Sequence, residues 1–522
     1  MRTQSTEVHA QRLFVACIIA LVATSFGFVV RGFLVGVWAQ EFNLTQGQVG
    51  AIQGAGLFPF ALSIVFFSLI IDRIGYGRAM VFAFLGHTIS AFITMTAASF
   101  EQLYVGTLLF ALANGTVEAV INPVTATLFP RSKTHHLNIL HAGWPGGLVL
   151  GGLLFMLLGN LHWKWQIGLY LIPTAVYGFM MIGQKFPVQE RVASGVSYAE
   201  MLREFGWGSC LIVCFFVVFA FDTVFGSLGL YEGTISWPAA LAIAAVPTIA
   251  FAAIYKSFGR PMFVFLLLVM ILLATTELGV DSWITNLMTP VLQQFSQYGG
   301  LMLLVYTSAI MFVLRFFAGP IVHRISPLGL LAACAALASI GLFWISNAGA
   351  APGMIFAAGT LYGVGKTFFW PTTLGVVTEQ FPRGGAMTIN AIAGVGMISV
   401  GVLGGPLLGS IQDRALDARL RATAPEIHAQ VAGEPHSAYL MTYRPIDRSR
   451  VTTLPEPARR VVDQITTENS QRTLATFAIL PAIMFFCYIG LILYFRARGG
   501  YRQVELPAPP PVPESGPTPR RV

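Results

Sequence analysis

Asn114-Gly-Thr-Val-Glu118-Ala-Val-Ile-Asn122-Pro123 lies within an apolar run that extends from residue 103 to residue 129. The run is long enough to cross a bilayer as a helix. On such a helix Asn114, Glu118 and Asn122 share one face, because they are four residues apart. A carboxylate inside the hydrocarbon costs several kcal/mol unless it meets a polar cavity or a partner. The stretch therefore predicts a membrane-spanning helix with one polar face turned toward the protein interior.

The whole chain has the composition of an integral membrane protein. Of its 522 residues, 55% are hydrophobic and only 10% are charged, against about 25% charged residues in soluble domains. The net charge of +8 is spread over short loops, which favours orientation in a lipid bilayer over binding of nucleic acid. The five cysteines lack metal-ligand or disulfide spacing, and no phosphate loop or nucleophile elbow occurs. These patterns predict neither a cofactor nor an enzyme.

Apolar stretches of about 20 residues recur along the chain and predict roughly fourteen transmembrane helices. They cover residues 13–38, 49–71, 79–100, 103–129, 138–159, 165–184, 208–228, 237–255, 262–288, 298–318, 328–346, 354–378, 387–411 and 473–495. The expected fold class is therefore an all-α membrane protein.

Basic residues in the connecting loops orient these helices. With the N-terminus inside, nearly all basic residues of the short loops fall on the inner side, a pattern typical of cell membrane proteins. They are Arg73, Arg78, Arg131, Lys133, Lys185, Arg191, Arg203, Lys256, Arg260, Arg324, Arg383, Arg496, Arg498 and Arg502. Both termini are then cytoplasmic. The long charged loop 412–472 lies outside, and the proline-rich tail 501–522 is expected to be disordered in the cytosol.

Two parts of the chain correspond weakly and in the same order. The matches are Asp72-Arg73-Ile74-Gly75 with His323-Arg324-Ile325-Ser326, Asn122-Pro123 with Trp370-Pro371, Phe129-Pro130-Arg131 with Phe381-Pro382-Arg383, and Asn138 with Asn390. Transporters built from two related bundles show such repeats. The pattern predicts one six-helix bundle in residues 1–184, a second in 262–500, and a linker with two extra central helices in 185–261.

The loop motif Ile71-Asp72-Arg73-Ile74-Gly75-Tyr76-Gly77-Arg78, with Ser68 in place of its first glycine, resembles the Gly-x-x-x-Asp-Arg-x-Gly-Arg-Arg motif of the major facilitator superfamily. Two further stretches resemble the fucose–galactose–proton symporter group within it. They are residues 118–123 with Leu137-Asn138, and Thr276-Glu277-Leu278-Gly279. The resemblance implies two six-helix bundles of major facilitator type, a small-molecule substrate, proton coupling at Glu118 and a sugar-site role for Asn138.

Two features depart from the fucose group. Its members place a carboxylate on the first helix, where this chain reads Val30-Arg31-Gly32. They also usually have twelve spans rather than the larger number expected here. The reversed charge leaves the substrate class open among a sugar, a sugar acid and another organic anion.

Charged residues inside the spans mark the predicted substrate and proton pathway. Arg31, Glu118, Glu277 and Lys366 fall at related depths, two of each sign, so pairing can offset part of their desolvation cost. The repeat places Glu118 at the position of Lys366. The alternative is that these charges only hold the bundles together, while nearby polar and aromatic groups pack or kink helices. The predicted pathway residues are Arg31, Glu118, Asn122, Asn138, His141, Glu277, Asp281, Lys366 and Trp370.

This pathway favours a secondary active transporter that works by alternating access, with proton-coupled uptake of a small polar solute. Glu118 is expected to take up a proton and release it when its partner changes between states. Asp72, Arg73 and Arg78 are expected to form a charge latch at the inner gate. The alternative is a fourteen-span, proton-driven exporter of drugs or metabolites, favoured by the span count and by Gly405-Pro406-Leu-Leu-Gly409, which resembles an antiporter motif. The protein is expected to be a monomer.

Overall fold

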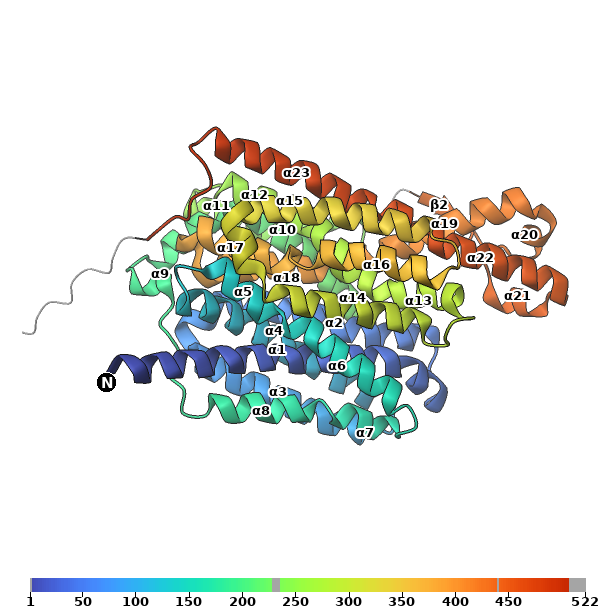
Figure 1. The fold of residues 1–522 in the computed structure, drawn as a ribbon, viewed down its shortest axis with the longest axis horizontal. Helices are drawn as coiled ribbons and strands as arrows, with labels where there is room; N and C mark the ends of the chain where they lie inside the picture. Colours follow the sequence, from blue (N-terminus) through green and yellow to red (C-terminus); the bar gives the residue numbers. More distant parts are fainter. Residues whose placement is uncertain (1, 228–234, 439–440, 507–522) are drawn as a thin grey trace, which may run out of the picture.

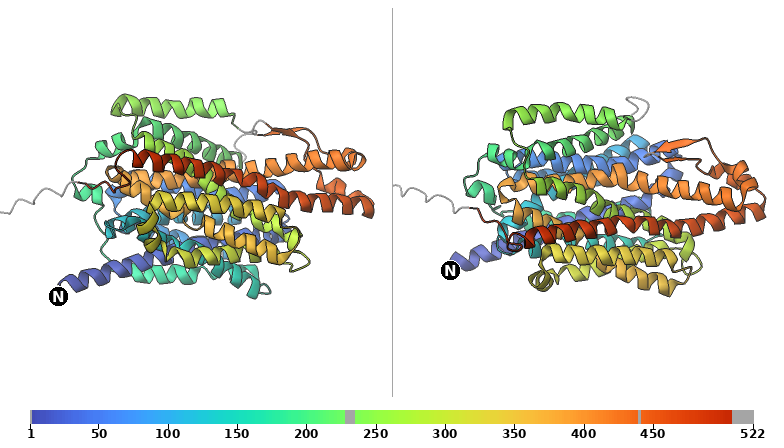
Figure 2. Two further views of the ribbon diagram at one scale, coloured as in Figure 1. Left: turned by 45° about the horizontal axis from the view of Figure 1, so that its top comes forward. Right: turned by 90° about the horizontal axis from the view of Figure 1, so that it is seen from above.

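The structure, a computed structural model, describes residues 2–227, 235–438 and 441–506 (Figure 1). It consists almost entirely of helices that run along the long axis of the molecule (Figure 1, Figure 2). The N-terminus and the described C-terminal residues lie at one end, which we call the terminal end. The opposite end carries a small subdomain, and we call it the loop end.

The first half of the molecule holds the polar stretch identified in the sequence, on α4. Its helices are α1 (Arg2–Glu41), α2 (Gln46–Ile74), α3 (Tyr76–Met95), α4 (Phe100–Leu128), α5 (Lys133–His141), α6 (Gly143–Leu157), α7 (Trp163–Gly168) and α8 (Leu171–Met181). Helices α5 and α6 follow one another with a single residue between them, and Pro145 in the first turn of α6 has no N–H to continue the hydrogen bonding of α5.

A connecting segment follows, with a short helix α9 (Glu190–Ala193) and two long ones, α10 (Tyr198–Ser227) and α11 (Trp237–Tyr255). Helix α10 is kinked at Gly206, whose φ of 72° lies in the region that favours glycine. It packs on α2 and α18 at the seam between the halves. Helix α11 covers the outer side of α10 (Figure 2).

The second half repeats the pattern of the first with additional breaks. Its elements are α12 (Pro261–Ala274), the π-helical turn η1 (Thr275–Gly279), α13 (Val280–Leu292), α14 (Gly299–Arg315), α15 (Ala318–Asn347), α16 (Pro352–Lys366), α17 (Phe369–Gln380), the short turn η2 (Pro382–Gly384), α18 (Gly385–Ser399), the π-helical turn η3 (Val400–Gly404), α19 (Gly405–Thr423), α20 (Pro425–Val431), β1 (His436–Ala438), β2 (Met441–Tyr443), α21 (Arg448–Thr453), α22 (Glu456–Phe477) and α23 (Ile479–Arg496). The two halves meet where α2 packs on α18 and α6 packs on α14.

The long charged loop of the sequence is a folded subdomain at the loop end. Helix α19 extends beyond the bundle, α22 returns to it, and the antiparallel strands β1 and β2 lie between them with α20 and α21. The subdomain has its own apolar core, separate from that of the bundle. It contains Leu416, Leu420, Val431, Val451, Leu454, Val462 and Ile465.

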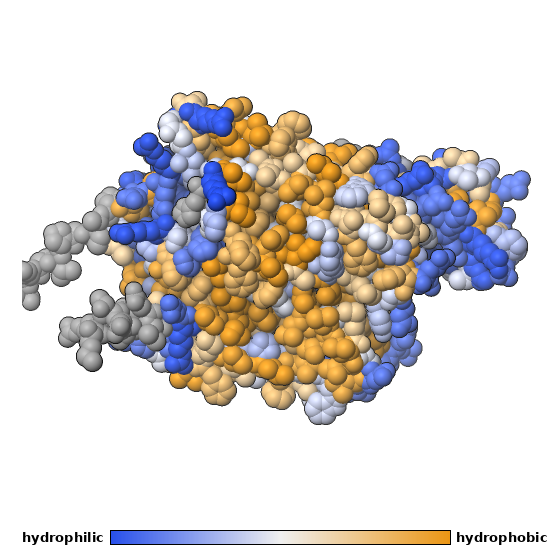
Figure 3. Space-filling view, viewed as in Figure 1, coloured by the Kyte–Doolittle hydropathy of each residue, from blue (hydrophilic) through white to orange (hydrophobic). Residues whose placement is uncertain are grey.

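The side of the molecule that faces outward between its two ends is apolar. Figure 3 shows a hydrophobic surface along the middle and hydrophilic residues at both ends. Large apolar side chains are exposed along the helices, for example Phe66 and Phe92, both 57% exposed, which suits contact with lipid. In the described part of the chain, eleven helices are long and apolar enough to cross a membrane. The expectation of an all-α, multi-span membrane protein is confirmed.

The backbone also repeats between the two halves. Gly75, which follows α2, has φ 82° and ψ 149°. Ser326, its partner in the sequence repeat, has φ 65° and ψ 160°. This region of backbone conformation is almost exclusive to glycine, and another residue held there costs about 1–3 kcal/mol. The two halves therefore share an unusual turn, and the second half forms it with an unsuitable residue.

Ser326→Gly is expected to stabilise the protein by about 1 kcal/mol, because the relief of strain exceeds the loss of the Ser326 hydroxyl as an acceptor for the Gly329 N–H. The thermal unfolding midpoint in detergent should rise. Gly75→Ser is the matched control and should lower the midpoint, because a Cβ at Gly75 meets no atom within 4 Å and only the backbone strain is added. A lower midpoint for Ser326→Gly would show that the hydroxyl contact outweighs the strain.

Candidate functional site

Arg315, the last residue of α14, lies at the centre of the polar contacts between the two halves. Its side chain is 1% exposed, and its guanidinium donates to three oxygens. One nitrogen donates to Glu277 Oε1 at 2.9 Å and another to the Thr367 carbonyl at 2.7 Å. The third donates to the His141 carbonyl at 2.5 Å. Because His141 belongs to the first half and the other two acceptors to the second, one side chain joins both halves.

Proline explains why the two carbonyls are available to Arg315. In an α-helix each carbonyl accepts from the N–H four residues later. Pro145 follows His141 by four residues and Pro371 follows Thr367 by four, and proline has no N–H. Arg315 supplies both missing donors. The breaks between α5 and α6 and between α16 and α17 thus create the acceptors that hold it.

Glu277 connects Arg315 to the start of α17. Its Oε1 pairs with Arg315, and its Oε2 accepts from the backbone N–H of Trp370 at 3.2 Å. That N–H belongs to the first turn of a helix, where backbone donors lack partners within the helix. Glu277 itself lies in the π-helical turn η1, a distortion that is frequent at functional sites. The structure therefore brings Glu277 and Trp370, both predicted from the sequence, into direct contact.

Lys366, the last residue of α16, forms an ion pair with Asp281 of α13. The Lys366 side chain is fully buried and that of Asp281 is 9% exposed. The ammonium also lies 5.0 Å from the centre of the Tyr362 ring. Both members of the pair belong to the second half, so Lys366 and Asp281 neutralise each other without the first half.

Glu118 is buried in α4 and is held by a neutral partner. Asn122, one turn later, donates from Nδ2 to Glu118 Oε2 at 2.8 Å. Its Oδ1 bonds to His141 Nε2 at 2.9 Å, and the His141 carbonyl accepts from Arg315. A chain of contacts thus runs from Glu118 across the interface to Glu277. Within the part of the chain that the structure describes, Glu118 has no ion-pair partner.

Asn138 of α5 also faces the second half. Its Nδ2 donates to Thr372 Oγ1 of α17 at 3.1 Å and to the Thr134 carbonyl at 2.8 Å. Its Oδ1 is buried and has no partner among the described protein groups. Since buried acceptors in proteins are nearly always satisfied, this oxygen is a candidate contact for a solute or water.

Arg31 lies apart from this network. Its guanidinium donates to Thr94, Thr107 and Ser90, at 3.0, 3.4 and 2.9 Å. It also lies 4.6 Å from the centre of the Phe110 ring. All of these partners belong to the first half, on α3 and α4. The expected grouping of Arg31 with the other buried charges is therefore not seen in direct contacts, because its side chain points into its own bundle.

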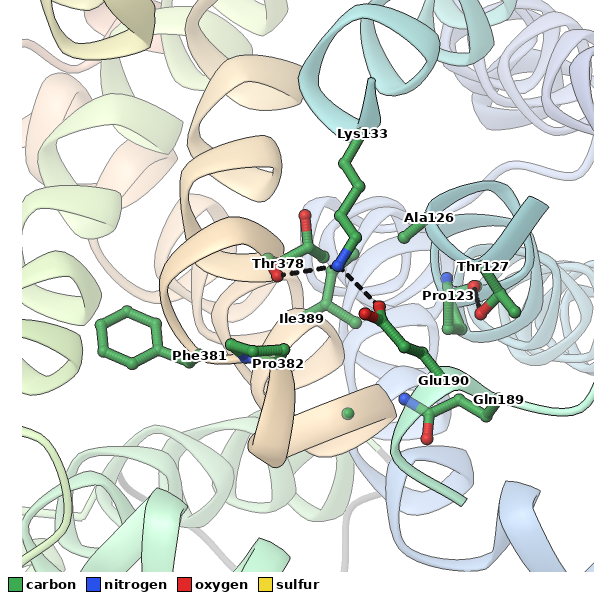
Figure 4. A pocket seen from close by; sticks show the side chains of 11 residues that line it. Pro123, Ala126, Thr127, Lys133, Gln189, Glu190, Thr378, Phe381, Pro382 and Ile389 are labelled. Atoms are coloured by element: carbon green, nitrogen blue, oxygen red, sulfur yellow. Dashed lines mark hydrogen bonds and ion pairs between the residues drawn. The ribbon is translucent and has the colours of Figure 1, made fainter. Parts of the chain in front are cut away.

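The terminal end is closed by contacts between the halves and the connecting segment. Lys133, at the start of α5, pairs with Glu190 of α9 at 2.6 Å and donates to the Thr378 carbonyl of α17 at 3.4 Å (Figure 4). Its side chain is 1% exposed. Beside it, a cavity of about 20 Å³ lies between Pro123 and Ile389, with room for about one water molecule.

Glu379, near the end of α17, is the second contact that closes the terminal end. Its Oε1 accepts from the hydroxyl of Thr134 at 2.5 Å and from the Thr134 N–H at 3.3 Å. Thr134 lies in the first turn of α5, where the helix dipole favours a carboxylate. The other oxygen of Glu379 accepts from the Tyr501 hydroxyl at 2.7 Å.

The beginning of the C-terminal tail corrects the expectation of disorder from residue 501 onward. The Val504 N–H donates to the Glu379 carbonyl at 2.8 Å, and Gln503 Nε2 donates to the Pro130 carbonyl at 2.8 Å. Residues 501–504 therefore contact both halves across the terminal end. They dock because α17 and the loop after α4 present unsatisfied carbonyls there. Residues 507–522 lie outside the described part.

The three predicted gate residues lie at the same end, where α2 ends and α3 begins. Asp72 pairs with Arg191 of α9, and the Arg73 guanidinium lies 5.2 Å from the centre of the Tyr198 ring. Arg78 is exposed. Asp72 and Arg73 contact the connecting segment, whereas Lys133 and Glu379 make hydrogen bonds between the two halves. A sequence signal for Lys133 and Glu379 exists, because each lies within two residues of one of the repeated Phe-Pro-Arg loops.

Two related helical halves, joined at a proline-broken interface that buries several charges, define a membrane carrier of the two-bundle class. A sequence profile of the Major Facilitator Superfamily matches residues 15–276, which is half of the chain. The chain belongs to the Major Facilitator Superfamily, whose members transport small molecules across membranes and are not enzymes.

Two curated relatives match shorter stretches. Multidrug resistance protein D of Escherichia coli is 23% identical over 131 residues, 24% of this chain and 32% of its own length. A gallate transporter of Pseudomonas putida is 25% identical over 154 residues, 29% of this chain and 34% of its own. The chain thus spans about a third of the length of these relatives.

Solved structures share the fold over most of the chain. The proton:xylose symporter XylE has a TM-score of 0.60 at 12% identity, covering 92% of this chain and 96% of its own. The human organic anion transporter MFSD10 has a TM-score of 0.56 at 13% identity, and the match covers 92% of this chain and 99% of MFSD10. The fucose:proton symporter FucP of E. coli has a TM-score of 0.53 at 14% identity, and the match covers 90% of this chain and 98% of FucP. The last agrees with the local sequence resemblance to the fucose group.

Proposed function

We propose that the protein is a secondary active transporter that works by alternating access and couples uptake of a small polar solute to protons. The observation that carries the proposal is Glu118, a buried carboxylate between the halves that is held by Asn122 instead of a cation. Protonation of such a carboxylate breaks no ion pair. Hydrogen bonds run from Glu118 through Asn122 and His141 to Arg315. Protonation of Glu118 can therefore alter the contacts that join the two halves.

The membrane arrangement proposed with this function has fourteen spans: the eleven long helices, α14, and the divided pairs α7–α8 and α16–α17. The bundles are residues 1–184 and 262–500, with the linker and its two extra helices in 185–261. With the basic loops inside, both termini are cytoplasmic and the protein lies in the cell membrane. The transporter works as a monomer.

An organic anion is the substrate class that we favour. One curated relative is named for gallate, an aromatic carboxylate, and one structural neighbour is named an organic anion transporter. The proposed pathway residues near the junction include the cation Lys366, the free acceptor of Asn138 and the aromatic Trp370. A sugar acid presents the same carboxylate with hydroxyls that suit Asn138.

The closed terminal end fits one of the two states that alternating access requires. Opening at that end requires Lys133 to leave Glu190 and Thr378, and Thr134 to leave Glu379. Separation of residues 501–504 from the first half belongs to the same step. In this proposal Asp72, Arg73 and Arg78 keep the connecting segment attached to the first half while the bundles rock.

The test is transport by the purified protein in vesicles, with a pH-sensitive dye in the outer medium. Gallate, a sugar acid and the neutral sugar fucose serve as probes. Addition of a transported anion should alkalinise the medium, and a proton ionophore should abolish accumulation without stopping exchange of labelled substrate. Accumulation that is indifferent to the ionophore would contradict proton coupling.

A proton-driven exporter is the alternative function. It is favoured by the name of the multidrug resistance relative and by the antiporter-like stretch 405–409. The same vesicles distinguish the two, because an exporter exchanges protons for substrate and the addition of substrate outside then acidifies the medium.

A further inference from the structure

Asn390, in the second half, satisfies a backbone carbonyl of the first half. Pro123 lies inside α4 and has no N–H, so the carbonyl four residues before it, that of Ala119, has no helical donor. Ala119 is fully buried, so bulk water does not reach this oxygen. Asn390 of α18 donates from Nδ2 to it at 3.0 Å, and Asn390 is itself fully buried.

The same arrangement occurs at the breaks caused by Pro145 and Pro371. There Arg315 donates to the freed carbonyls of His141 and Thr367. Two of the three freed carbonyls, on Ala119 and His141, thus belong to the first half and take their donors from the second. At these two positions a carbonyl freed by proline therefore joins the two halves through a hydrogen bond.

The bond of Asn390 lies where the gate must open. Pro123 and Ile389, the neighbour of Asn390, line the small cavity beside Lys133 at the terminal end (Figure 4). When the halves part there, Asn390 withdraws and the Ala119 carbonyl loses its donor. Opening exchanges this bond for contact with water, which leaves a modest net cost. In the proposed alternating-access cycle the bond is made in the closed state and lost in the open one.

We propose that Asn390 is a positioning residue that favours closure of the terminal end by donating to the carbonyl that Pro123 frees. The proposal rests on alternating access in the proposed function but not on any substrate or on protons. It gives Asn390 a role different from that of its repeat partner Asn138, whose Nδ2 bonds a side chain and its own helix.

The test measures how often the terminal end is open. Thr378→Cys places a thiol at the cavity, on a residue that is 9% exposed when the end is closed. Its reaction with a membrane-impermeant maleimide, without substrate or proton gradient, reports opening, and the chain with only its five native cysteines gives the background. Asn390→Leu should raise the labelling rate about fivefold, the factor that corresponds to one net hydrogen bond.

Pro123→Ala provides the control that separates hydrogen bonding from packing. Alanine restores an N–H for the Ala119 carbonyl, so closure no longer depends on Asn390. Pro123→Ala alone should raise labelling, and Asn390→Leu added to it should change the rate less than about twofold. Equal effects of Asn390→Leu in both backgrounds, or no effect of either single substitution, would overturn the proposal. Because no transport is measured, these outcomes are independent of the uptake assay. If Asn390→Leu does not fold, Pro123→Ala alone tests the proposal, and an unchanged labelling rate for that variant would overturn it.

Discussion

Arg315→Met is expected to abolish transport and to lower the free energy of unfolding by about 3–5 kcal/mol, the cost of breaking a buried ion pair. The substitution leaves the Glu277 carboxylate buried without its cation and removes the donor of two freed carbonyls, on His141 and Thr367. The measurements are solute uptake into vesicles and the midpoint of unfolding in detergent.

The chain offers a matched control in an ion pair of the same length whose arginine is exposed. Arg260 pairs with Glu204 at 2.9 Å, as Arg315 does with Glu277, but its side chain is 55% exposed. Arg260→Met should therefore cost less than about 1 kcal/mol and leave transport unchanged. Similar losses for both substitutions would show that burial is not what makes the Arg315 pair important.

Two further variants separate charge from geometry at Arg315. Arg315→Lys keeps the positive charge but lacks the planar fork that reaches three acceptors, so stability should recover in part and transport should not. Arg315→Met combined with Glu277→Gln removes both charges and should recover much of the stability. Full transport by this double variant would contradict a mechanistic role of the pair.

Glu118→Gln is expected to abolish proton-driven accumulation while exchange of labelled substrate continues. Glutamine has nearly the shape of glutamate and can still accept from Asn122, so the contact at 2.8 Å is retained. It cannot bind and release a proton. Uptake against a gradient and exchange at equal concentrations, measured in the same vesicles, distinguish coupling from substrate movement.

Glu101→Gln is the control for this prediction. Glu101 lies in the first turn of the same helix, α4, but is exposed at the loop end. Its neutralisation should leave both accumulation and exchange unchanged. If Glu118→Gln still accumulates substrate at the expense of a proton gradient, Glu118 is not the coupling carboxylate.

Most of the fold was predictable because hydropathy and local turn chemistry decide it. The apolar stretches and the repeat both follow from short segments, and Gly75 and Ser326, which the repeat pairs, have similar backbone angles. Arg315 shows what could not be predicted from local sequence. It ends an apolar run, where a long side chain can extend toward the membrane surface. Its burial depends on distant proline breaks that pack against it.

The partners of the buried charges were less predictable than their presence. The apolar runs indicated how deep Arg31 and Lys366 lie along their helices, but the direction of each side chain around its helix depends on packing between helices. Arg31 points toward α3, and Lys366 pairs with Asp281, which was not one of the four charges expected to pair. The contacts of residues 501–504 were missed for a related reason, since their acceptors lie far away in the sequence.

The subdomain at the loop end has a practical value for imaging. A transporter of 56.5 kDa is small, and most of its surface is hidden by detergent or lipid. Helices α19 and α22 run without a chain break from the bundle into the subdomain, whose separate apolar core gives it a fixed shape. It protrudes on one side only (Figure 1). In electron micrographs it should act as a built-in marker of orientation, so particles can be aligned without an attached antibody fragment.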